Sequence, residues 1–168
     1  MKLIIIIQVA VAFVIGIGSL FVLYRLLNNY VRRKSEIAET NTAFAIFQVG
    51  ILLAGSMIMS SVVSPAVNAI RFLNQSEVFN IQSCMTSLVY VGIFVVIGIV
   101  CTIMVIAGGV FTFFQLTQVN EWAEIKQNNI PTSLISAAII VGLSLIMDEY
   151  VGHLCEALIP YPDVLQIR

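Results

Sequence analysis

Four ionisable side chains gather near the end of the last apolar stretch of the chain. They are Asp148, Glu149, His153 and Glu156. Residues three and four apart share one face of a helix, so the last three of them would lie together. Ionisable groups at membrane depth are costly and are functional candidates by default. Three interpretations stay open: groups in a wet outer interface, an ion or proton path, or ligands of a divalent metal.

The same face continues toward the start of the stretch through Ala138 and Gly142. Small residues let a neighbouring helix approach closely, so we expect this face to point into a helix bundle. A metal at Glu149, His153 and Glu156 would need further ligands from a second helix, and the chain has no second histidine. We therefore predict no resident metal and no cofactor.

The second apolar stretch carries hydroxyls at positions that match the acidic ones. Counted from the asparagine that precedes each stretch, Ser60 and Ser61 correspond to Asp148 and Glu149, and Ser64 adds a third hydroxyl. A bundle with pseudo-twofold symmetry would bring the two polar faces near its axis. The interpretation that follows is a hydrated cleft that opens outward.

The elements that position these residues are membrane helices. The chain has 168 residues, of which 60% are hydrophobic and 10% are charged, and its mean hydropathy is +1.02. Soluble domains carry about 25% charged residues. Apolar stretches long enough to cross a bilayer cover 3–27, 42–67, 86–116 and 130–159. Because lipid offers no hydrogen bonds to the backbone, all four must be helices, so we predict an all-α membrane protein with a single membrane domain over 1–168.

Basic residues gather in the first connection between stretches. Arg32, Arg33 and Lys34 lie there. The positive-inside rule places this connection in the cytoplasm, together with the third connection at 117–129. Both termini and the second connection are then outside. The basic cluster could hold anionic lipid head groups, at about 1 kcal/mol per charge.

The two cytoplasmic connections end in similar motifs. Glu36 is followed five residues later by Asn41, and Glu124 is followed at the same offset by Asn129. Each asparagine directly precedes an apolar stretch, where it would be a good helix N-cap. The capping role alone could explain the similarity. A shared origin is the other reading, and it predicts two tandem parallel two-helix repeats.

If the two motifs share an origin, repeat one covers 1–80 and repeat two covers 81–168. The stretch NEWAEIKQNN at 120–129, which includes Glu121, resembles the signature of the bacterial domain-of-unknown-function family 350. The weaker copy is EIAETNTA at 36–43. This resemblance implies a small inner-membrane protein with four spans and the motif carried twice. It implies no settled activity, and it hints at membrane-stress systems with phage-shock-like partners.

Two cysteines fall on the predicted outer side. Cys84 lies just before the third span and Cys155 near the end of the fourth. In an oxidising periplasm the two could form a disulfide, provided that their Cα atoms come within about 7 Å.

No nucleophile–base pair, phosphate-binding loop or cofactor fingerprint appears in the sequence, so we predict that the protein is not an enzyme. Two classes of function remain. One is a membrane subunit or scaffold that forms homo-oligomers in the bilayer and docks other protein subunits through its cytoplasmic connections. The other is a small oligomeric ion or solute channel or transporter with an acidic cleft. Nucleic acid is not an expected partner, because the chain has no large basic face.

Overall fold

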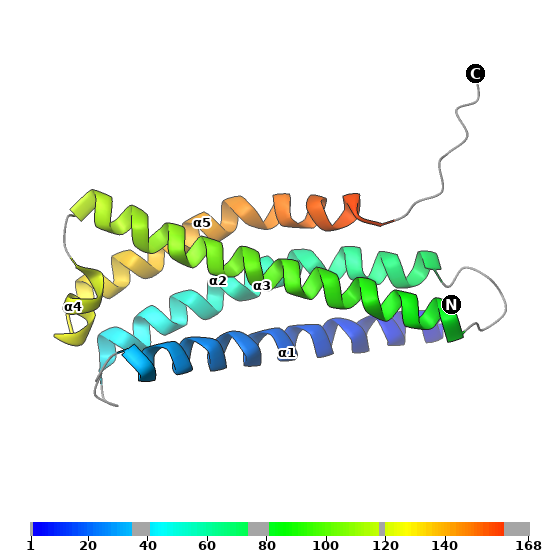
Figure 1. Cartoon of the computed structure of the whole chain (residues 1–168), viewed down its shortest axis with the longest axis horizontal. Coiled ribbons are helices and arrows are strands. Elements are labelled where there is room, and N and C mark those ends of the chain that lie inside the picture. The colour runs from blue at the N-terminus through cyan, green and yellow to red at the C-terminus, as the bar shows by residue number, and fades with distance from the viewer. Residues whose placement is uncertain (1, 35–40, 74–80, 118–119, 160–168) are drawn as a thin grey trace, which may run out of the picture.

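Helices make up most of the part of the chain that the structure describes, which is residues 2–34, 41–73, 81–117 and 120–159 of a computed structural model. The helices are α1 (Lys2–Lys34), α2 (Thr42–Leu73), α3 (Ile81–Thr117), α4 (Glu121–Lys126) and α5 (Ile130–Ala157). The four long helices run up and down in a bundle, and α4 lies at one end of it (Figure 1). This end, where α2 and α5 both begin, is called the α4 end below.

Three described helices are long and apolar enough to cross a membrane. They are Thr42–Leu73, Met85–Thr117 and Ile130–Ala157, and they confirm the helical reading of the last three apolar stretches. In α1 the described apolar segment, Ala12–Leu26, is shorter than a membrane crossing requires. The first predicted crossing therefore stays a prediction. The described helices extend past several predicted limits because a helix does not stop where its apolar stretch meets the interface.

α2 is the central helix of the bundle. It contacts α1, α3 and α5, and its contact with α5 is the most extensive. A Cβ atom added to Gly50 would lie 2.5 Å from the Cβ and 2.8 Å from the Cα of Ala137, so the two backbones touch here. Within the described residues α1 and α5 share no contact, whereas α3 lies against both α2 and α5. The four helices are therefore not arranged with full pseudo-twofold symmetry.

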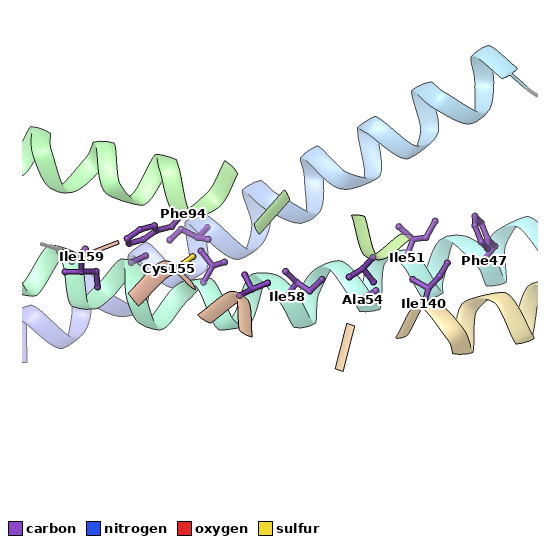
Figure 2. Close-up of a cluster of buried hydrophobic side chains, with 14 of the residues drawn as sticks. Phe47, Ile51, Ala54, Ile58, Phe94, Ile140, Cys155 and Ile159 are labelled. Atoms are coloured by element: carbon purple, nitrogen blue, oxygen red, sulfur yellow. The ribbon is translucent and has the colours of Figure 1, made fainter. Parts of the chain in front are cut away.

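The buried side chains form a row along α2. Figure 2 shows this row from Phe47 near the α4 end, through Ile58, to Ile159 at the other end. Lipid tails are as apolar as these side chains, so in a bilayer their burial is stabilised by close packing and not by removal from water. Close contacts between small residues, such as Gly50 with Ala137, matter for that reason.

Pro65 lies inside α2 and is buried. Proline has no backbone N–H, so it cannot bond the carbonyl of Ser61 four residues earlier. That carbonyl faces α5, where a Cβ on Gly152 would lie 3.4 Å from the Ser61 oxygen. A Cβ at position 152 would therefore be in ordinary van der Waals contact with this carbonyl, which lacks its usual partner within the helix.

Candidate functional site

The α4 end is held together by Asn41. Its side chain is 8% exposed, and its Oδ1 accepts a hydrogen bond from the Phe44 backbone N–H at 2.8 Å. This confirms the predicted N-cap of α2. The Nδ2 group also reaches across the bundle and donates to the carbonyls of Ile125 at 2.7 Å and Lys126 at 3.4 Å. Asn41 therefore caps its own helix and satisfies carbonyls at the end of α4.

The side chain of Asn128 makes a second contact between the α4–α5 turn and the start of α2. Its Oδ1 accepts a hydrogen bond from the Ala43 backbone N–H at 2.9 Å, so a second donor at the start of α2 is satisfied by a distant residue. Asn128 has φ 60°, in the left-handed region that asparagine tolerates better than most side chains. We call the reciprocal arrangement of Asn41 and Asn128 the asparagine clasp.

Asn129 confirms the second predicted cap. Its Oδ1 accepts from the Thr132 backbone N–H at 3.4 Å, at the start of α5. Its Nδ2 donates to a carboxylate oxygen of Glu124 at 2.5 Å, so the two matching motif residues contact one another directly. The Glu–Asn spacing noted in the sequence is thus a local contact that orients the α4–α5 turn.

The clasp rests on packed apolar side chains. Ile125 is fully buried, and the ring of Trp122 meets that of Phe47 edge-on, with centroids 5.6 Å apart at 74°. Such aromatic pairs contribute about 0.5–1.5 kcal/mol beyond their burial. α4 and the turn that follows it are consequently fixed to the start of α2.

The acidic face of α5 points away from the rest of the chain. The side chains of Glu149 and His153 are 76% and 67% exposed, and Glu156 is half-buried. His153 lies 3.7 Å from Glu149 and 4.0 Å from Glu156. The expectation that this face points into the bundle of a single chain is therefore wrong, because α5 turns the opposite face toward α2 and α3. Asp148, on the same helix, is half-buried.

These side chains are not arranged as a metal site within the described structure. Among the described residues, no group of three or more His, Cys, Asp or Glu side chains is placed to share one ion. Glu149 and Glu156 approach different ring nitrogens of His153, Nε2 and Nδ1.

The serines of α2 direct their hydroxyls to their own helix. Ser60 donates to the Met57 carbonyl and Ser61 to the Ile58 carbonyl, each at 2.8 Å. Ser64 is exposed. Within the described residues the structure joins none of these hydroxyls to a carboxylate, and the hydrated cleft stays a prediction.

Cys155 is fully buried in the core row, and its thiol forms no disulfide with another described side chain. The side chain of Cys84 lies outside the described residues, so the disulfide stays a prediction. In an oxidising compartment we expect the oxidised chain to migrate faster than the reduced chain on a denaturing gel. Cys84→Ser should abolish the difference, and two free thiols in the chain purified without reductant would contradict the bridge.

Several predicted residues have no described side chain. Arg32, Arg33 and Lys34 lie in the last turn of α1, and Glu121 is the first residue of α4. Nothing is described of their side chains, and Glu36 lies outside the described residues altogether.

Asn128 is the main residue that the sequence reasoning missed. The signal available was its place in an Asn–Asn pair before a span, because asparagine is enriched at left-handed positions. Ser133 and Ser136 were also missed. Both hydroxyls are fully buried in the first turns of α5 and have no hydrogen-bond partner among the described residues.

Comparison with known proteins assigns the chain to a family. No curated protein and no solved structure matches the chain. The family described as Domain of Unknown Function (DUF350) matches residues 2–151, which contain the whole clasp and all but the end of α5. The chain, with its three long apolar helices, belongs to the DUF350 family.

Proposed function

We propose that this protein is an integral membrane subunit that crosses the bilayer four times, forms homo-oligomers, and binds another protein through its α4 end. The asparagine clasp is the observation that carries the proposal. It fixes the start of α2 to the end of α4 by hydrogen bonds of 2.7 and 2.9 Å. A surface that is already ordered loses less conformational entropy when it binds a partner.

The groups that surround the clasp suit protein recognition. Lys126, Gln127 and Asn128 are exposed at the turn between α4 and α5. They lie at the same end of the bundle as the last turn of α1, which carries the basic cluster (Figure 1). A partner could therefore contact both connections at once, and the basic residues could also contact anionic lipid.

The proposed orientation has the α4 end in the cytoplasm and both termini outside, in the bacterial inner membrane. The support is the excess of basic residues near the end of α1. The proposal includes an envelope or membrane-stress role with cytoplasmic partners, which rests on the family resemblance alone.

A small oligomeric channel is the second candidate. The observation in its favour is the exposure of Glu149 and His153, because charged side chains on the outside of one chain could line a path shared by several chains. Ser60 and Ser61 donate their hydroxyl protons to their own helix, which leaves only their oxygen lone pairs to face such a path.

Photo-crosslinking in native membranes tests the proposal. With a photoreactive residue at Lys126, we expect an adduct with a second protein. The same residue at Met104, which is 64% exposed in the middle of α3, should give no protein adduct other than copies of this chain. Gln127→Cys in a cysteine-free chain should react with an impermeant maleimide only from the cytoplasmic side.

Two results would count against the proposal. If neither position gives a heterologous adduct, the chain has no partner at its α4 end. If proteoliposomes show ion flux that is lost in Glu149→Gln, the channel replaces the membrane subunit as the better account.

A further inference from the structure

Two serine hydroxyls lie inside the bundle without a protein partner. Ser133 and Ser136 are both 0% exposed, and neither hydroxyl oxygen has a hydrogen-bond partner among the described residues. A hydroxyl that is removed from solvent without a hydrogen bond costs free energy, so buried polar groups are paired with protein or with ordered water. We infer that one water molecule binds here and bridges the two hydroxyls.

The pair differs from the other buried hydroxyls of the described structure. Each of the others donates to a carbonyl of its own helix, three or four residues earlier; they are Ser19, Ser87, Thr102 and Ser144. Such a bond satisfies the donor without help from any other group. Ser133 and Ser136 make no bond of this kind, so the partner of the pair lies off their own helix.

The spacing of the two serines suits a single bridging molecule. Residues three apart on a helix are neighbours on its surface, with Cβ atoms about 5–6 Å apart. An O–H···O hydrogen bond spans about 2.7–2.8 Å, so two such bonds through one water oxygen cover a gap of that size. A bridge of this kind is nearly as favourable in enthalpy as a direct hydrogen bond.

Close helix contacts enclose the site on one side. Ala137, the residue after Ser136, touches α2 at Gly50, and Ile140 touches α3 at Gly109. On the other side, α5 begins at the Asn129 cap and the clasp. The water site therefore lies along α5 between the clasp and the first close contacts with α2 and α3, out of reach of bulk solvent.

The chemistry of the pair selects water and not a cation. A serine hydroxyl donates one hydrogen bond and accepts others, which matches what a water molecule offers in return. Buried waters have two to four polar partners, and two hydroxyls meet that need. A calcium ion takes about six to eight oxygen ligands, many of them charged. Among the described residues, no group of three His, Cys, Asp or Glu side chains could add such ligands.

A crystal structure of the full chain, grown from a lipid mesophase, tests the site directly. We expect an electron-density peak within hydrogen-bond distance of the Oγ atoms of both Ser133 and Ser136. Crystals grown in a thallium salt should show no anomalous signal at that peak, and a signal there would replace the water with a cation. The inference is also overturned if the two hydroxyls bond each other or their own helix, with no peak between them.

Unfolding titrations in mixed micelles give an independent test. Removal of either hydroxyl should release the water and leave the other hydroxyl unpaired, so Ser133→Ala and Ser136→Ala should each lower the midpoint denaturant concentration. The double variant should be no less stable than the weaker single variant, because it leaves no hydroxyl unpaired. Ser144→Ala is the matched control, since Ser144 is equally buried on α5 but donates to the Val141 carbonyl, and it should shift the midpoint less.

Two patterns in these titrations would contradict the bridge. If both single variants raise the midpoint and their effects add in the double variant, the hydroxyls have no partner at all. If both single variants behave like Ser144→Ala, each hydroxyl bonds its own helix.

Discussion

Gly50→Ala is expected to lower the free energy of unfolding by about 1–3 kcal/mol, the usual cost of overpacking. The added methyl group would lie 2.5 Å from the Cβ and 2.8 Å from the Cα of Ala137. These atoms belong to or adjoin the backbone, so no change of side-chain rotamer can make room. Alanine favours the helix over glycine by about 1 kcal/mol, but the loss of contact between α2 and α5 outweighs that gain.

The measurement is an unfolding titration of the purified protein in mixed micelles. Gly108→Ala is the control, since a methyl group there meets nothing within 4 Å and should leave stability unchanged or slightly higher. Adding Ala137→Gly to Gly50→Ala should restore part of the loss. If Gly50→Ala proves as stable as the control, α2 and α5 are not in backbone contact.

Asn41→Ala is expected to destabilise the protein by about 2–4 kcal/mol, from a lost helix cap together with a buried carbonyl left unpaired. The substitution removes the acceptor for the Phe44 N–H and the donor to the Ile125 carbonyl. Limited proteolysis at the α4 end should become faster in the same variant, because the end of α4 is no longer fixed to α2.

Asn41→Asp separates the two roles of this side chain. An aspartate keeps the cap oxygen but turns a second oxygen toward the carbonyls of Ile125 and Lys126, so it should be no more stable than the alanine variant. Asn120→Ala is the control: Asn120 is exposed and caps only the short α4, through a 3.3 Å bond from the Ala123 N–H. Should Asn41→Asp behave like the unmodified protein, the hydrogen bonds across the bundle contribute nothing.

Local features of the fold followed from the sequence. Long apolar stretches predicted the membrane helices, because backbone hydrogen bonds must be satisfied within such segments. Asn41 and Asn129 were predicted as caps from their position alone, and both accept the expected backbone N–H three residues later. These are short-range interactions that depend on a few neighbouring residues.

The choice of which helix faces meet could not be predicted in the same way. α5 is apolar on nearly every side, so its pattern does not indicate an inner face. The facing side is decided by how Gly50 fits Ala137 and Gly109 fits Ile140, which depends on residues far apart in the chain. The way α5 packs on α2 and α3 turns Glu149 away from the bundle. The same packing brings Asn128 to the start of α2, where it accepts a hydrogen bond from the Ala43 N–H.

The two hydrogen-bond partners in the clasp lie far apart in the sequence, and this separation has a consequence for biosynthesis. Asn41 leaves the ribosome long before the carbonyl it binds, which is 84 residues later. The start of α2 therefore gains its hydrogen bond to the end of α4 only after α4 has been translated.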